Sequence, residues 1–140
     1  FQTPYSALQR EHEDLITAAA EAGAGTFIRG GAAKGAPSED KAWDLGRPAR
    51  PGGPADPFAD GSAERFWDAA KLDELAEGTG RMAFTLRFTL THPGLSTTIV
   101  GTANPAHLAQ NVEAAQAGPL PADLYEEAKR RLTAAGATPE

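Results

Sequence analysis

The chain has 140 residues, of which 41% are hydrophobic, and its formal net charge is −6. This acidic balance argues against nucleic acid or an anionic membrane as a partner, because no basic patch is available to displace counterions. Cysteine is absent, which excludes disulfides and cysteine-ligated metals, and without a membrane-length apolar run or a signal-peptide pattern we expect a soluble, cytoplasmic protein.

The first part of the chain predicts a strand, a helix and a second strand. Residues 1–5 have the composition of a strand, and residues 11–22 favour a helix that ends at Gly23. The face of this helix that we expect to be buried carries Leu15, Ala18, Ala19 and Ala22. Residues 26–28 predict a short strand. Glycine and proline concentrate between about 30 and 62, which predicts a long loop.

Two helices are predicted after this loop. The first covers about residues 63–77 behind an N-cap at Ser62. Its expected inward residues are Phe66, Ala69, Ala70 and either Leu72 or Leu75. The second runs from Arg81 to about Thr91, because its apolar residues recur at helical spacing although many are β-branched or aromatic, and Pro93 stops it.

Residues 96–111 predict a strand, a turn and a helix. Residues 97–100 are β-branched, as expected of a strand that is buried on both faces. Asn104 is a good N-cap, and Pro105 suits the first position of a helix over 105–116. The start of this helix would attract an anion such as a phosphate, although an ordinary strand-to-helix turn explains the same residues.

The last predicted element is an amphipathic helix from Pro121 to Leu132. One of its faces carries Leu124, Ala128 and Leu132. Along the chain, strands therefore alternate with helices, which implies parallel pairing and right-handed crossovers. The predicted fold class is α/β.

Three segments, in this order, carry a resemblance to a known family. They are FQTPYSALQRE at 1–11, AFTLRFTLTHPG at 83–94 and STTIVGTANPAHLAQN at 96–111. The first resembles the sixth strand of the aldo-keto reductases with the loop after it. The second is similar to the helix and His-Pro-Gly segment before the last strand of that family, and the third to that last strand with its Leu-x-x-Asn helix. The resemblance implies that residues 1–140 are a single partial domain, the carboxy-terminal portion of a (β/α)8 TIM barrel with about three parallel strands. Because a full barrel takes about 250 residues, we expect a fragment of one.

The resemblance also implies a function and a site. The function is an NAD(P)-dependent oxidoreductase that reduces aldehydes or ketones, with NADP or NAD as cofactor and a small carbonyl compound as substrate. The positions matching the family's cofactor site are Gln2, Arg29, Gly30, Ala32, Gly35, Gly101, Thr102, Asn104, His107, Gln110 and Asn111. By this match Gln2 holds the nicotinamide carboxamide, Arg29 covers the nicotinamide ring and Asn111 binds the adenine. Packing at a strand end explains Gln2 equally well. Trp43 is the candidate for substrate contact.

His107 leaves the choice between NADP and NAD open. Many members of the family carry an arginine at this position for the 2′-phosphate of NADP. No lysine or arginine falls between Ser96 and Gln116. An imidazole attracts a phosphate less than a bidentate guanidinium does.

No catalytic residue is assigned in this chain. The catalytic Tyr, Lys, Asp and His of the family lie in the first half of its barrel, so the amino-terminal half is predicted to be required for activity. The segment from Gly78 to Ala83 fits the pattern G-x-G-x-x-A of dinucleotide-binding folds, but it lies between predicted helices and is set aside. The histidines are dispersed, so no metal site is expected. Two alternatives to an enzyme remain: a non-catalytic binding or regulatory remnant, and an interaction scaffold.

Overall fold

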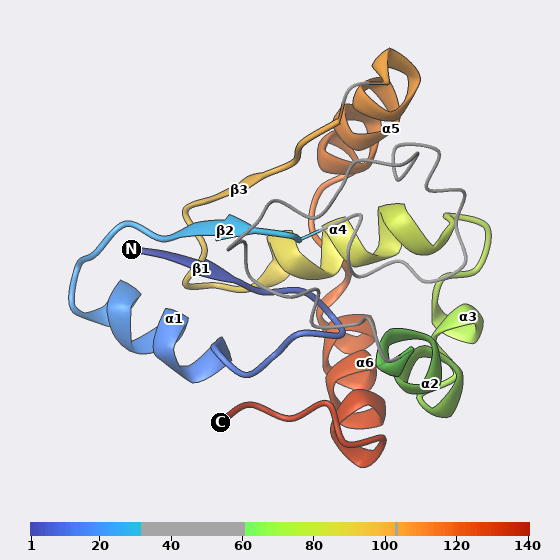
Figure 1. Ribbon diagram of the computed structural model, residues 1–140, viewed down its shortest axis with the longest axis horizontal. Coiled ribbons are helices and arrows are strands. Elements are labelled where there is room, and N and C mark those ends of the chain that lie inside the picture. Colours follow the sequence, from blue (N-terminus) through green and yellow to red (C-terminus); the bar gives the residue numbers. More distant parts are fainter. Residues whose placement is uncertain (32–60, 103) are drawn as a thin grey trace, which may run out of the picture.

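The computed structural model describes residues 1–31, 61–102 and 104–140, so most of the predicted loop over 30–62 lies outside the described residues. Strands and helices alternate along the chain, with three helices between the second and third strands (Figure 1). The elements are β1 (Gln2–Pro4), α1 (Glu13–Glu21), β2 (Phe27–Arg29), α2 (Ser62–Ala69), α3 (Leu72–Leu75), α4 (Arg81–Thr91), β3 (Thr97–Ile99), α5 (Pro105–Gln116) and α6 (Ala122–Ala134). None of these helices is long and apolar enough to cross a membrane.

The three strands form one parallel sheet in the order β1-β2-β3. Three rows of paired residues cross it: Gln2–Phe27–Thr97, Thr3–Ile28–Thr98 and Pro4–Arg29–Ile99. The prediction of an α/β fold with about three parallel strands is therefore confirmed.

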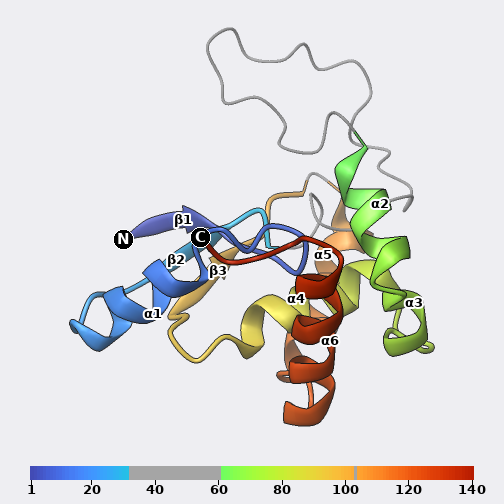
Figure 2. The same ribbon diagram turned by 90° about the horizontal axis from the view of Figure 1, so that it is seen from below.

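The sheet has one buried and one exposed face. Thr3 and Ile28, from the middle row, are buried, and Figure 2 shows α1, α4 and α6 on one side of the sheet. In the outer rows, whose side chains point the other way, Phe27 is 49% and Ile99 52% exposed. The prediction that residues 97–100 are buried on both faces is wrong, because β3 is an edge strand and no described segment covers its outer face.

The main hydrophobic core joins the buried face of the sheet to helices α1, α2, α3, α4 and α6. Its largest fully buried apolar side chains are Trp67, Tyr5, Phe84, Phe88, Ile16, Ile28, Leu72 and Leu132. Trp67 and Phe84 meet edge to face within it: their ring centroids are 6.0 Å apart and their planes lie at 83°. Such edge-to-face pairs add to the stabilisation from burial alone.

The buried face of α1 differs from the predicted one. Ile16 is fully buried, whereas Leu15 is 46% exposed, and Ala18 is also exposed. Glu13 is buried one turn before Ile16. The alanine-rich sequence carries too weak a periodic signal to decide which side of the helix meets the core.

The single helix predicted over 63–77 is two helices. Lys71, between α2 and α3, has a left-handed backbone with φ of 49°, which ends α2 and redirects the chain. After this break Leu72 is buried as one of the two predicted options. Trp67 is fully buried, Ala70 is buried as predicted, and Ala69 is exposed although it was among the predicted inward residues.

The helix boundaries follow the local capping signals in most places. Helices α4 and α5 have their predicted bounds, and Pro121 precedes α6. Asn104 caps α5 as predicted, because its Oδ1 accepts a hydrogen bond from the Ala106 N–H at 2.9 Å. The start of α2 differs, since Gly61 is the N-cap residue and Ser62 is already helical.

Candidate cofactor site

The carboxyl ends of the three strands lie at one edge of the sheet, because the strands are parallel. Pro4, Arg29 and Ile99 form the last paired row. Gly30 and Gly101 follow β2 and β3 beyond this row. Candidate residues from two separate segments, Arg29 with Gly30 and Gly101, thus reach the edge at which parallel barrels hold their functional groups, whereas Gln2 lies in the first paired row.

Gln2 and Arg29 share the exposed face of the sheet. Gln2 belongs to the first paired row and Arg29 to the last, and rows two apart point to the same side. Both side chains are exposed. Phe27 and Ile99 supply apolar surface beside them. This face therefore offers an amide and a guanidinium next to apolar surface.

The turn after β2 lies tightly against α4. Gly30 has φ of 74°, in the left-handed region. At Gly31 an added Cβ would lie 2.8 Å from Thr89 Cγ2 and 2.9 Å from Thr98 Oγ1. Thr89 Oγ1 donates to the Gly31 carbonyl oxygen at 2.9 Å. Three predicted site residues that come later in this segment lie outside the described residues: Ala32, Gly35 and Trp43.

The turn before α5 is built by its own polar side chains. Thr102 Oγ1 accepts a hydrogen bond from the Asn104 N–H at 3.1 Å, and Asn104 in turn caps the helix. Gly101 is exposed, with open space where a Cβ would stand. Thr102 and Asn104 therefore shape the turn whether or not a ligand is bound.

Helix α5 brings its three candidate residues to one side. His107, Gln110 and Asn111 are three and four residues apart, which is the spacing of neighbours on a helix surface. His107 is half-buried and Gln110 is exposed. Asn111 is only 7% exposed.

A cavity of about 430 Å³ lies between α4 and α5. Gln110 and Asn111 line it from α5, Met82 and Ala83 line it from α4, and the loop 78–80 closes another side. Its volume is in the range of small-molecule sites. Neither His107 nor the residues of the exposed sheet face are among its described lining residues.

The charges around this cavity favour an uncharged ligand group. Arg87 is the only cation among its described lining residues, and it donates to the carbonyl oxygens of Gly118 and Pro119, both at 2.9 Å. Glu113 adds a carboxylate. The two amides, which both donate and accept hydrogen bonds, are the groups best suited to a heterocycle.

The loop 78–80 is a part of the site that sequence analysis set aside. It does lie between two helices, as predicted, so it is not a strand-to-helix phosphate loop. Gly78 and Gly80 both take positive φ, 72° and 77°. The sequence contained no signal that this loop meets α5, because they are about thirty residues apart along the chain.

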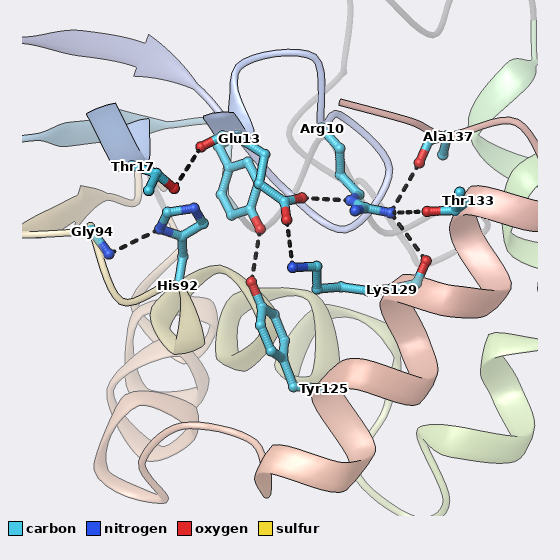
Figure 3. Close-up of polar contacts among 10 residues, drawn as sticks. Arg10, Glu13, Thr17, His92, Gly94, Tyr125, Lys129, Thr133 and Ala137 are labelled. Carbon is cyan, nitrogen blue, oxygen red and sulfur yellow. Dashed lines mark hydrogen bonds and ion pairs between the residues drawn. The ribbon is translucent and has the colours of Figure 1, made fainter. Parts of the chain in front are cut away.

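A buried charged cluster joins the loop that follows β1 to α1 and α6 (Figure 3). The Glu13 carboxylate accepts a hydrogen bond from Arg10 Nε at 2.6 Å and pairs with Lys129 Nζ at 2.7 Å. Arg10 Nη1 also donates to the carbonyl oxygens of Lys129 and Ala137, each at 3.1 Å. Burial alone would raise the pKa of Glu13, but the hydrogen bonds and charges of Arg10 and Lys129 outweigh it and hold this pKa below its usual value. The cluster attaches α6 to the loop after β1.

The chain's two tyrosines belong to the same buried region. The hydroxyls of Tyr5 and Tyr125 are 3.1 Å apart (Figure 3), and burial raises the pKa of both. His92 meets the edge of the Tyr5 ring at 5.1 Å, its Nδ1 accepts from the Gly94 N–H at 3.0 Å, and burial lowers its pKa. Neither tyrosine reaches the exposed face beside Gln2. The described residues also include no group of three or more side chains placed to hold a metal ion.

Comparison with known proteins identifies the fold. No protein-family model matches the chain, and no curated protein is significantly similar to it. Among solved structures, the holo form of aldo-keto reductase AKR11C1 from Bacillus halodurans is similar with a TM-score of 0.64 and 20% identity, over 93% of this chain and 40% of that one. Its apo form gives a TM-score of 0.63 at 20% identity, over 93% and 42%. The chain spans about two fifths of the length of these structures and has the fold of the carboxy-terminal part of an aldo-keto reductase barrel.

Proposed function

We propose that this chain is the cofactor-binding portion of an aldo-keto reductase and holds NADP or NAD for the reduction of an aldehyde or ketone. One observation carries the proposal. Gln2 and Arg29 share one exposed face of the sheet, and the helix that follows the last strand of this sheet, α5, carries Gln110 and Asn111, which line a cavity.

The nicotinamide end is assigned to the exposed sheet face. The carboxamide of nicotinamide donates and accepts hydrogen bonds, and so does the Gln2 side chain. The planar guanidinium of Arg29 can cover a ring face. Phe27 and Ile99 supply the apolar surface that the ring needs nearby.

The adenine end is assigned to the cavity between α4 and α5. Adenine presents an amino donor beside a ring-nitrogen acceptor, and an Asn or Gln amide pairs with both. Asn111 and Gln110 provide two such amides. The turn at Gly101 and Thr102, near the N-terminus of α5, would then hold the adenosine side of the cofactor, and the pyrophosphate would lie by the backbone N–H groups of the segment that begins at Gly30.

The division of labour in the reaction follows from these positions. The dinucleotide supplies the hydride when it is bound, and this chain binds and orients it. The proton donor and most of the pocket for the small carbonyl substrate are assigned to the amino-terminal half of a barrel, with Trp43 as the substrate contact from this chain. The cytoplasmic location expected from the sequence belongs to the same proposal.

A second candidate function is a non-catalytic NAD(P)-binding or regulatory protein of the same fold. Tyr5 and Tyr125 pair with each other in the core, so both candidates assign to this chain the binding of the cofactor and not the proton donor. Carbonyl reduction measured with the amino-terminal half present separates the two candidates. Turnover supports the reductase, and cofactor binding without turnover supports the second.

Equilibrium dialysis of the complete barrel, in which this chain is joined by the amino-terminal half, with NAD and with ADP-ribose tests the orientation of the cofactor. Asn111→Ala should weaken both ligands, because both contain adenine. Gln2→Ala should weaken NAD alone, because ADP-ribose lacks the carboxamide. Each lost hydrogen bond should cost about 0.5–1.5 kcal/mol of binding free energy, and up to ~3 where a partner stays buried and unpaired.

The opposite results would reject the assignment. Equal loss of ADP-ribose binding in both variants would contradict the orientation. If both residues only satisfy hydrogen bonds at the sheet edge, the melting temperature falls while the affinities remain unchanged. Gln116→Ala, which removes the same kind of amide at an exposed site on α5 outside the described cavity lining, is the matched control.

A further inference from the structure

Three side chains meet where α3 is followed by α4. Asp73 Oδ1 accepts hydrogen bonds from Trp67 Nε1 at 2.8 Å and from Arg81 Nε at 2.9 Å. Arg81 Nη2 donates to the other carboxylate oxygen, Oδ2, at 2.5 Å. The Arg81 guanidinium also lies 5.1 Å over the Trp67 ring. The carboxylate thus accepts from an arginine in the two-point geometry that makes such pairs strong.

This ion pair spans the loop that closes the cavity. Asp73 is in α3 and Arg81 is the first residue of α4, so the loop 78–80 lies between the two charged partners. Trp67 is fully buried and packs edge-on against Phe84 of α4. The pair is therefore anchored to the core at a fixed point.

The loop itself has few restraints of its own. Thr79 bonds back to the Ala76 carbonyl oxygen through its N–H at 2.9 Å and its Oγ1 at 2.8 Å. Gly78 and Gly80 flank it, and glycine has access to more backbone conformations than any other residue. A restraint that joins the two ends of such a loop excludes backbone conformations that the loop sequence would otherwise allow.

We propose that Asp73 and Arg81 are positioning residues: their ion pair holds the loop 78–80 as a wall of the cavity and thereby sets its affinity for the adenine end of the cofactor. This inference rests on the proposed function, because it takes the cavity as the adenine site. Neither residue touches the ligand, and both act through the loop.

The chain supplies a matched control on the same helix. Asp73 and its neighbour Glu74 have side chains that are 59% and 58% exposed, and each pairs with an arginine. Glu74 Oε2 pairs with Arg131 of α6 at 2.7 Å and so stabilises α3 without spanning the loop. Asp73→Asn and Glu74→Gln therefore each remove one paired charge, and only the first releases the loop.

Two measurements, made with the amino-terminal half of the barrel present, test the proposal. The first is hydrogen exchange at the amides of residues 78–81. The second is the affinity for ADP-ribose, measured by equilibrium dialysis. Asp73→Asn should speed exchange in the loop and raise the dissociation constant for ADP-ribose about three- to tenfold, the range expected for loss of one hydrogen-bonded restraint. Glu74→Gln should change neither.

Arg81→Lys is a second variant that keeps the charge and loses the planar fork. It should give the same two changes to a smaller degree. Because it preserves the ion pair in weakened form, it also covers the case in which Asp73→Asn fails to fold.

Several outcomes overturn the proposal. If Asp73→Asn and Glu74→Gln change loop exchange and ADP-ribose affinity equally, the Asp73–Arg81 ion pair only stabilises α3 in general. A released loop with unchanged ADP-ribose affinity would remove the positioning role. Asn111→Ala separates this failure from failure of the proposed function. If Asn111→Ala weakens ADP-ribose binding and Asp73→Asn does not, only the positioning role is lost. If the unaltered chain does not bind ADP-ribose, both are lost.

Discussion

Under the proposed function, His107 is the residue assigned to the choice between NADP and NAD. It is half-buried in the first turn of α5, one turn before Asn111. His107→Arg should tighten NADP by about 1–2 kcal/mol and leave NAD unchanged, because a guanidinium makes charge-assisted hydrogen bonds to a 2′-phosphate. Dialysis of both dinucleotides near pH 7.5 measures the difference.

The control for this substitution is Ala109→Arg. Ala109 is an exposed residue of the same helix, two positions further on and therefore on another side. Ala109→Arg adds the same charge at a position from which the guanidinium does not reach the site assigned to the 2′-phosphate. If both variants tighten NADP alike, or if His107→Arg shifts NAD and NADP equally, the position assigned to the 2′-phosphate is wrong.

At the residue scale, the sequence predicts what local chemistry determines. The Asn104 cap follows from a side chain that reaches its own helix start, so its role could be read from the sequence. The Asp73–Arg81 pair depends on the break between α2 and α3 at Lys71, which no local sequence signal predicted. The choice between Leu15 and Ile16 as the buried residue of α1 depended on packing against the sheet, and the alanines around them gave no direction.

At the element scale, α6 is attached to the rest of the fold by buried polar groups as well as by apolar packing. Arg10 donates to the Lys129 carbonyl oxygen across 119 positions of sequence. The periodicity of apolar residues along the chain does not indicate contacts between residues so far apart in sequence. This explains why the helix could be predicted and its attachment could not. Several members of the cluster titrate, so the attachment depends on pH.

The direction of this pH dependence follows from the shifted pKa values. Burial lowers the pKa of His92 in the fold, and the charges of Glu13 and Asp14 only partly offset this. Unfolded, the same imidazole takes up a proton near its usual pKa of about 6.5. The stability contributed by neutral His92 is therefore present above this pH and is lost as the pH falls. Glu13, whose pKa is also lowered, loses its contribution only below about pH 4.3. Burial would lower the pKa of Lys129, but its pairing with Glu13 outweighs burial and raises this pKa, so Lys129 loses its contribution at alkaline pH.

His92→Asn should make the stability of the chain less dependent on pH between 7.5 and 5.5. An Asn oxygen can replace Nδ1 as acceptor for the Gly94 N–H without titrating. The free energy of unfolding of the unaltered chain should fall by up to about 1.4 kcal/mol per pH unit over this range. Urea denaturation of both proteins at each pH measures the slope. An equally steep slope in the variant would assign the pH dependence to other groups.

At the scale of the whole molecule, the fold class was predictable and the exposure of the sheet was not. Alternation of strands and helices predicts a parallel sheet wherever it occurs. Burial depends on what covers a strand, and the β-branched residues of β3 suit a covered strand although Ile99 is 52% exposed here. The sequence of β3 thus fits a closed barrel better than a three-stranded open sheet.

The chain alone should therefore bind apolar dyes and associate, and the amino-terminal half of an aldo-keto reductase barrel should suppress both. The exposed face carries Phe27 and Ile99, and β1 and β3 leave unpaired strand edges among the described residues. Replacing both Phe27 and Ile99 by Thr should lower dye fluorescence and light scattering, because it removes the apolar surface and keeps β-forming residues. Leu15→Thr, at an exposed leucine on α1 and away from this face, should change neither signal. The prediction is contradicted if the chain alone is monodisperse, melts cooperatively and binds no dye, because its sheet would then be stable without the amino-terminal half of a barrel.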